Sequence, residues 1–206
     1  CWVPDAAGIM NLAGALSHPA ILPKVPVTYL GPLSRFKKRD VESKYDLCII
    51  LSGPEPQRTI FEKIILQDLN KAEGKVCLVR GLPSETEVPR LNNSSIEIKN
   101  HLAAEELNNV MLQSKIIISR CGYSTVMDLV NLQKKAILIP TPGQTEQEYL
   151  GGYLQEQKIF YGVDQNSFSL PEVLKSAAAF EFNTASFTVN DYENVVENFV
   201  ATLRHQ

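Results

Sequence analysis

Short apolar runs alternate with amphipathic segments along most of the chain. Runs such as YDLCIIL at 45–51 and KIIIS at 115–119 have the length of strands, and their continuous apolar character is typical of strands that are covered on both faces. The runs that we expect to be strands are Val25–Leu30, Tyr45–Leu51, Lys75–Val79, Ser95–Ile98, Lys115–Ser119 and Ala136–Ile139.

Apolar residues recur every three or four positions between these runs, which predicts helices with one buried face. The expected helices are Arg58–Asn70, Ala103–Met111, Thr125–Leu132, Thr145–Gln157, a segment after Pro171, and Asp191–Arg204 with Asn190 or Asp191 as its N-cap. Strands that alternate with helices of about 10–15 residues predict right-handed βαβ units. We therefore expect an α/β fold, a Rossmann-like parallel sheet of about six strands with helices on both faces.

The first 23 residues have no such pattern, because prolines and glycines interrupt them. We expect residues 1–23 to be a connector, or the end of an N-terminal domain that this chain lacks. Residues 24–206 then form the Rossmann-like domain. The start at Cys1 rather than Met suggests a piece of a longer protein.

Composition narrows the possible partners and compartments. The chain has 206 residues, 44% of them apolar, and a net charge of −3, which is typical of a globular protein without a basic surface for nucleic acid. No apolar run approaches the roughly 20 residues that cross a membrane. Four scattered cysteines indicate buried free thiols rather than a disulfide framework, which favours the cytoplasm. Three scattered histidines indicate no metal site.

The loop 119–125 is the first candidate for ligand binding, since ligands of open α/β sheets lie beyond the carboxyl ends of the strands. A buried strand ends near Gly122, and Ser124 and Thr125 lie in the first turn of the next helix, where free N–H groups attract phosphate. The alternative is an ordinary helix cap. Asp128 lies one turn after Ser124 and suits ribose hydroxyls, or it is a solvated carboxylate.

Three further places offer weaker candidates. Glu146 and Gln147 lie in the loop after Ala136–Ile139 and suit the hydroxyls of a hexose; the alternative is a capping box formed by Thr145 and Glu148. Gly53 permits close backbone approach, but its loop contains two prolines and matches no phosphate-binding motif. Arg35 suits a diphosphate, or is a surface arginine.

The stretch Ile116–Gly152 resembles the C-terminal domain of glycosyltransferase family 28, which is the C-terminal half of a GT-B fold. The resemblance rests on IIISRCGYSTVMD at 116–128, AILIPTP at 136–142 and TEQEY at 145–149. The family includes an enzyme that adds N-acetylglucosamine to the lipid-linked peptidoglycan precursor.

The resemblance implies a site for a nucleoside-diphosphate sugar, most naturally a UDP-sugar. It implies that Gly122, Tyr123, Ser124 and Thr125 hold the diphosphate together with Arg35, and that Asp128 binds the ribose. It assigns Glu146 and Gln147 to the sugar, with Thr145 beside them, and Lys99–Leu102 to the uracil. The chain departs from the family at the glycine-rich loop around Gly53, at Asp128 where the family has Glu, and at Gly151.

The resemblance also implies an inverting transfer of a hexose or N-acetylhexosamine to an acceptor hydroxyl, without a cofactor or metal. The catalytic residues stay unknown, because the family places the base and the acceptor site in the N-terminal domain. The expected acceptor is a glycan or a lipid-linked sugar, and any peripheral contact with a membrane is expected through the missing half. The alternatives are a sugar-nucleotide hydrolase or epimerase of GT-B fold, or a non-catalytic nucleotide-sugar-binding module. A plain NAD-binding domain is disfavoured, since the glycine fingerprint is missing.

Overall fold

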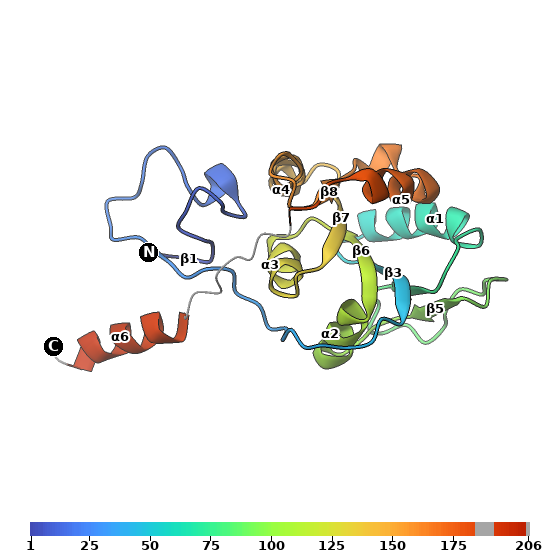
Figure 1. Cartoon of the computed structure of the whole chain (residues 1–206), viewed down its shortest axis with the longest axis horizontal. Helices are drawn as coiled ribbons and strands as arrows, with labels where there is room; N and C mark the ends of the chain where they lie inside the picture. Colours follow the sequence, from blue (N-terminus) through green and yellow to red (C-terminus); the bar gives the residue numbers. More distant parts are fainter. Residues whose placement is uncertain (184–191, 205–206) are drawn as a thin grey trace.

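The computed structural model describes residues 1–183 and 192–204; the expected N-cap, Asn190 or Asp191, lies outside them. Its centre is a parallel sheet of six strands in the order β5-β4-β3-β6-β7-β8 (Figure 1). The strands are β3 (Tyr45–Ile50), β4 (Val76–Val79), β5 (Ile96–Lys99), β6 (Ser114–Arg120), β7 (Lys135–Ile139) and β8 (Tyr161–Gly162). The expected α/β class is confirmed.

Helices cover both faces of this sheet, as the sequence predicts. One core layer packs α1 (Gln57–Leu69) and α5 (Leu170–Ala179) on the sheet, and the other packs α2 (Ala104–Leu112), α3 (Tyr123–Asn131) and α4 (Thr145–Glu156). Side chains alternate between the layers: in β3, Leu47 and Ile49 belong to the α1 side and Cys48 to the α3 side. Cys48, Cys77 and Cys121 are buried free thiols, as expected, and Cys1 is exposed.

The expectation that Val25–Leu30 forms a strand of the main sheet is wrong. Only Thr28–Tyr29 (β2) is extended, and it pairs with Trp2–Val3 (β1) in a separate two-stranded sheet. Pro26 lacks an N–H donor and cannot extend the ladder, so the pairing is confined to a short stretch. The sixth strand of the main sheet is instead β8, at the opposite end of the chain.

The N-terminal segment folds around the buried carboxylate of Asp5. This carboxylate accepts hydrogen bonds from the N–H groups of Ala6, Leu12 and Ala13 and from the Ser17 hydroxyl, at 2.6–3.0 Å. Four donors on one anion hold the loop without regular structure other than a short 3₁₀ turn, η1 (Gly14–Leu16). The boundary at residue 23 stays a prediction, although β1 and β2 pair across it.

The segment rests on the sheet domain through tyrosines of α4. Tyr149 accepts through its hydroxyl from the N–H of Ala15 at 2.7 Å, and Tyr153 donates to the Asn11 side chain at 2.9 Å. Gly14 has a φ of +50°, and a Cβ there would lie 2.3 Å from the Tyr149 hydroxyl, so glycine is required.

The C-terminal helix α6 (Tyr192–Arg204) lies beside the N-terminal segment, away from the sheet (Figure 1). Phe199 of α6 meets the Trp2 ring edge to face at 5.2 Å. None of the helices that the structure describes is long and apolar enough to cross a membrane.

The strand order reverses direction between β3 and β6. From β3 the chain proceeds outward to β4 and β5, and from β6 it proceeds to β7 and β8 on the other side. Crossovers therefore leave the carboxyl ends of β3 and β6 open, at Ile50 and Ser119, which are register partners. Ligands of doubly wound sheets bind at this kind of switch point.

Candidate functional site

A cavity of about 270 Å³ opens at the switch point. It is lined by the ends of β3 and β4, by α2 and the residues before it, by α3, and by the loop before β3. Apolar side chains, Leu102, Leu107 and Met111, line one side. Arg35, Thr125 and Asp128 bring polar groups to the other. This combination of an apolar wall and a few converging polar groups is typical of a small-molecule site.

The tip of α3 reaches this cavity without a capping side chain. The helix begins at Tyr123, two residues earlier than expected. Gly122 is its N-cap in an extended conformation, and no side chain makes a cap hydrogen bond there. A Cβ on Gly122 would meet no atom within 4 Å, so there is open space beside the N-cap residue. Ser124 is exposed and Thr125 lines the cavity. Unpaired N–H groups and the helix dipole make such a tip a favourable place for an anion.

The Tyr123 side chain turns away from the tip. Its hydroxyl donates to the backbone oxygen of Pro4 at 2.8 Å, and burial raises the pKa of Tyr123. Tyr123 therefore fastens the N-terminal segment to α3, and only its backbone N–H faces the side where we expect the diphosphate.

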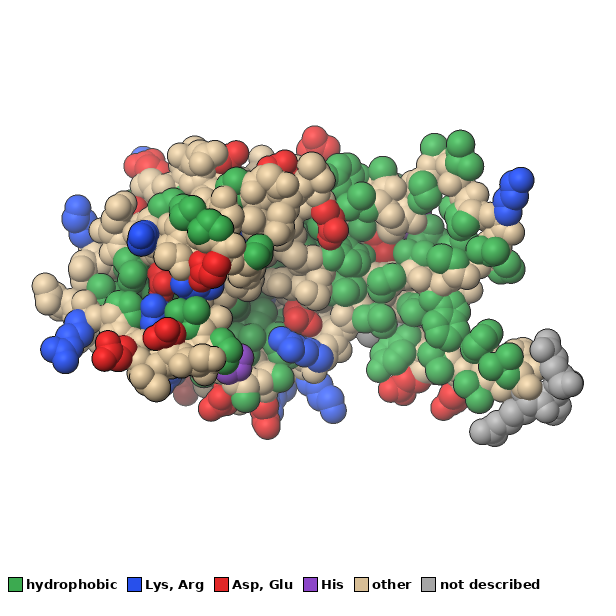
Figure 2. All heavy atoms as spheres, turned by 180° about the vertical axis from the view of Figure 1, so that it is seen from behind, with side chains coloured by type: hydrophobic (Ala, Val, Ile, Leu, Met, Phe, Trp, Pro, Cys, Tyr) green, Lys and Arg blue, Asp and Glu red, His purple; other side chains and the backbone are tan. Residues whose placement is uncertain are grey.

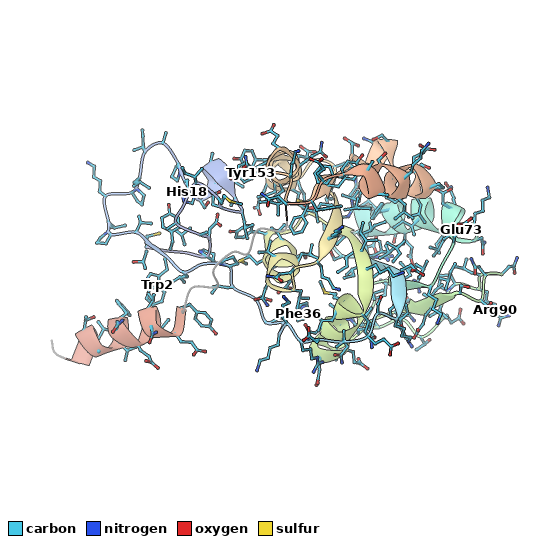
Figure 3. The ribbon with its side chains drawn as sticks, viewed as in Figure 1. Trp2, His18, Phe36, Glu73, Arg90 and Tyr153 are labelled. Atoms are coloured by element: carbon cyan, nitrogen blue, oxygen red, sulfur yellow. The ribbon has the colours of Figure 1, made fainter. Side chains whose placement is uncertain are left out.

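Arg35 stands on a loop that is tied down at both ends. Four hydrogen bonds join residues 33–37 to α2 and α3: Leu33 N–H to Met127 Sδ, Ser34 Oγ to Asp128 Oδ1, Asn131 Nδ2 to the Phe36 oxygen, and Asn108 Nδ2 to the Lys37 oxygen. Phe36 lies beside α2 and α3 and anchors the loop in the core (Figure 3). The guanidinium of Arg35 lies 4.9 Å from the centre of that ring, exposed and at the cavity wall.

Asp128 is a buried carboxylate, 9% exposed, at the cavity wall. Burial raises its pKa, while the hydrogen bond from Ser34 and the charge of Arg35 act in the opposite direction. The carboxylate thus sits in a place where ionisation costs free energy and where two neighbours reduce that cost. A ligand hydroxyl is a natural further donor.

The loop after β7 lies one strand further along the edge. Thr145 and Glu146 are exposed there. Gln147 is half-buried and accepts at Oε1 from the Thr141 N–H at 3.0 Å, while its Nε2 donates to Gln144. The amide of Gln147 therefore shapes its own loop.

The capping box that was the alternative interpretation of this loop is not formed. Gln144 is the N-cap and Thr145 is the first helical residue, and Glu148 accepts instead from the N–H of Gly143 at 2.8 Å. Gly143 has a φ of +82°, a left-handed conformation that glycine adopts readily, in the turn before this helix.

Gly53 lies next to the cavity rather than in its lining. It has a φ of +101°, and a Cβ there would lie 3.9 Å from the hydroxyl of Thr141. The preceding residue, Ser52, is the one that lines the cavity. Of the ten residues expected at the site, Arg35, Thr125 and Asp128 meet in one cavity; Gly122, Tyr123 and Ser124 form the adjoining helix tip.

Sequence reasoning gave no role to Ser34, Ser52 or Arg120. Arg120 is only 2% exposed and donates to backbone oxygens, with no carboxylate partner in the described part of the chain; burial lowers its pKa to about 10. The sequence feature that could have revealed Arg120 is a charged residue at the end of an apolar strand.

His101 and Leu102 line the cavity, and both belong to the stretch that we expect to bind the uracil. Residues 1–183 and 192–204 contain no group of acidic, histidine or cysteine side chains suited to a metal.

Comparison with known proteins identifies the family of this domain. Residues 48–199 match the model of the glycosyltransferase family 28 C-terminal domain. The chain is 24% identical over 164 residues to the UDP-N-acetylglucosamine–N-acetylmuramyl-(pentapeptide) pyrophosphoryl-undecaprenol N-acetylglucosamine transferase of Sulfurihydrogenibium sp. (strain YO3AOP1). That match covers 74% of this chain and 46% of the relative, so the chain spans about half the relative's length.

Solved structures share the fold at low sequence identity. MurG of Acinetobacter baumannii superposes with a TM-score of 0.55 and 16% identity over 87% of this chain and 57% of its own. The glycosyltransferase VinC in complex with dTDP superposes with a TM-score of 0.58 and 11% identity, over 90% of this chain and 50% of its own. The likeness of this chain to both structures establishes the architecture. With a family model matched over most of its length, the chain belongs to the glycosyltransferase family 28 C-terminal domain family.

Proposed function

We propose that this chain is the donor-binding domain of an inverting glycosyltransferase and that its cavity binds a nucleoside-diphosphate sugar, preferably a UDP-sugar. The observation that carries the proposal is the cavity at the switch point. There an uncapped helix tip, a tethered arginine and a buried carboxylate lie around one space. The first two suit a diphosphate, and the carboxylate suits the hydroxyls of a ribose.

In this proposal the uracil of the donor binds against the apolar wall around Leu102 and Leu107. Arg35 and the N–H groups of residues 123–125 bind the diphosphate and stabilise the negative charge that grows on it as the bond to the sugar breaks. Thr145, Glu146 and Gln147 reach the sugar from the next loop, with Gln147 exchanging an internal hydrogen bond for a hydroxyl. The displacement itself needs a base and an acceptor, which we assign to a companion domain.

An exposed apolar surface supports a place for that companion domain. Hydrophobic side chains gather over the N-terminal segment and α6 (Figure 2), among them Trp2, Ile9, Met10, Leu16 and Phe199. Contiguous exposed apolar patches usually mark interfaces. The acidic residues of α6, Glu193 and Glu197, disfavour a direct contact of this helix with an anionic membrane. We place the protein in the cytoplasm, with any membrane contact made by the companion half.

A thermal-shift and calorimetric panel tests donor binding. UDP, GDP, dTDP and uridine are compared at equal concentration, because a ligand that binds only the folded state raises the Tm. We expect UDP to give the largest shift and uridine a small one, as the diphosphate supplies most contacts. Equal shifts for uridine and UDP, or no shift with any diphosphate, contradict the proposal.

The reaction type is a separate question. The alternative hydrolase or epimerase binds the same donor but releases free sugar or an epimer, whereas a transferase yields a glycoside only with an acceptor. Product analysis of the full-length protein with a UDP-sugar distinguishes them. The domain alone is expected to bind donor and to transfer nothing; transfer by this chain alone contradicts the assignment of the base to a companion domain.

A further inference from the structure

Ser34 and Asp128 lie 94 residues apart in sequence and share a hydrogen bond beside the cavity. Ser34 Oγ donates to Asp128 Oδ1 at 2.6 Å and accepts from the Phe36 N–H at 3.1 Å. The acceptor role fixes the serine oxygen in its own loop, and the donor role directs its proton at the carboxylate. The hydroxyl thereby holds one carboxylate oxygen of Asp128 in place.

The two residues stand in different positions relative to the cavity. Asp128 is part of the lining, whereas Ser34 is not among the lining residues and donates its hydrogen bond to the carboxylate from outside the lining. A carboxylate has about four acceptor positions, so the bond to Ser34 leaves others for a donor in the cavity. Ser34 therefore acts on a ligand only through Asp128.

Two loops bring charged or titratable groups to the cavity that the Asp128 carboxylate lines. Arg35 belongs to the same loop as Ser34, and His101 lines the cavity before α2. The hydrogen bond from Ser34 favours the charged form of Asp128 and works against its burial, which raises the pKa. Removing the hydroxyl leaves burial opposed by Arg35 alone, so the carboxyl protonates at a higher pH.

We propose that Ser34 is a positioning residue that orients the Asp128 carboxylate toward a ribose diol, so that the domain prefers ribonucleoside to 2′-deoxyribonucleoside diphosphates. The inference rests on the proposed function and deepens it. An oriented acceptor distinguishes a ligand that has the hydroxyl from one that lacks it, because the acceptor is left without its donor in the second case. A freely rotating or protonated carboxyl distinguishes them less.

Calorimetric titration with UDP and 2′-deoxyuridine diphosphate tests this, since the two ligands differ in one hydroxyl. We expect the unmodified protein to prefer UDP by about tenfold, the effect of one hydrogen bond to a charged group. Ser34→Ala is expected to reduce that preference at least about threefold, because the affinity for UDP falls while the affinity for the deoxy ligand changes little. Ser34→Thr keeps a hydroxyl and is expected to retain the preference.

The pH profile and a double-mutant cycle separate positioning from general support of the fold. As the pH is lowered, the preference for UDP over the deoxy ligand is expected to disappear when Asp128 becomes protonated. In Ser34→Ala this loss is expected at a higher pH than in the unmodified protein. In the Asp128→Asn background, Ser34→Ala is expected to have no further effect on the preference, because both changes remove the same interaction.

Two results overturn the inference in distinguishable ways. If the unmodified protein binds no nucleoside diphosphate, the proposed function fails and the inference with it. If it binds UDP, but Ser34→Ala leaves the preference and its pH profile unchanged, or weakens both ligands equally, only the role of Ser34 is refuted.

Discussion

Arg120, the last residue of β6, donates from Nη2 to the backbone oxygen of Gln57, the first residue of α1, at 2.9 Å. Its Nη1 lies within hydrogen-bond distance of the backbone oxygens of Ile139 and Pro140, where β7 ends. One buried side chain thus links the carboxyl ends of β6 and β7 to the start of α1. These are the elements whose loops surround the candidate site.

Replacing this link is expected to lower stability. Arg120→Met keeps apolar contact with the Phe61 ring, over which the guanidinium lies, but leaves backbone oxygens without donors. The free energy of unfolding is expected to fall by about 2–4 kcal/mol. Urea unfolding measures it. Arg120→Lys, which keeps the charge but cannot reach several acceptors at once, should give an intermediate loss; a loss below about 0.5 kcal/mol for Met means that the link has little importance.

Arg35 is expected to matter for binding and not for stability. Its side chain is exposed at the cavity, so Arg35→Ala should change the free energy of unfolding by no more than about 0.5 kcal/mol. The affinity for UDP should fall about tenfold or more, because a charge-assisted contact to the diphosphate is lost. Calorimetry with uridine is the matched control, since it has no diphosphate and should bind equally to both proteins.

The tip of α3 offers a substitution with opposite effects on stability and binding. Ser124→Asp adds a negative charge in the first helical turn, which should stabilise the ligand-free protein by about 0.3–1 kcal/mol. The same charge repels a diphosphate, so the UDP-induced rise in Tm should disappear. Ser124→Asn has a similar shape without charge and should keep most of the shift. A normal UDP response in Ser124→Asp would place the diphosphate elsewhere.

The buried carboxylate of Asp128 is expected to make the stability of the protein without ligand depend on pH. Since burial raises its pKa in the folded state, the folded protein holds this proton more tightly than the unfolded chain. Its contribution to stability is therefore present in acid and is lost as pH rises through the folded-state pKa. Asp128→Asn should raise the Tm at neutral pH by a few degrees, since about 1 kcal/mol corresponds to roughly 2–4 °C.

The gain in Asp128→Asn should shrink as the pH is lowered toward the ordinary aspartate value of about 4, because the Asp128 carboxyl of the folded protein becomes protonated and is then as uncharged as asparagine. Thermal melts from pH 4 to pH 8 without ligand measure it. A stability gain that is independent of pH would show that the carboxylate charge is not its cause. The variant should also bind UDP more weakly, which makes Asp128 a residue kept for binding at the expense of stability.

Asp5 is expected to control the N-terminal segment locally. Asp5→Ala removes the acceptor for the N–H groups of Leu12 and Ala13, so hydrogen exchange at these amides should accelerate at least about tenfold. Amides in the middle of β3 should change little. Asp5→Asn retains one acceptor oxygen and should show a smaller increase. Uniform acceleration across the sheet would mean that the segment supports the whole domain.

The central strands and helices were predictable because each one carries its own pattern. The run at 45–51 is apolar except for Asp46 and becomes a strand covered on both faces, and the stripe in 58–70 becomes α1. Val25–Leu30 was mistaken for a strand of the main sheet because periodicity does not name a strand's partner. The segment Ile159–Val163 stands out after the helix that precedes it, but its pattern did not show that Tyr161 and Gly162 pair with β7.

The candidate site was predictable where one loop contains it. Gly122, Ser124 and Asp128 belong to a single strand–turn–helix unit, so their spacing already placed them on one helix tip and face. Ser34 was beyond reach, since its contact with Asp128 crosses 94 residues. Arg120 was likewise visible as a residue, but its acceptors come from α1 and β7.

The sequence alone determined the alternation of strands and helices, the α/β class and the loop that opens α3, since hydrophobic period and turn chemistry act over short distances. Tertiary structure decided which strands are neighbours, that Arg35 and Asp128 share one cavity, and that Ser34 donates a hydrogen bond to the carboxylate from outside the lining. Those relations depend on packing between segments far apart in the chain, and packing is set by the shapes of all the buried side chains together.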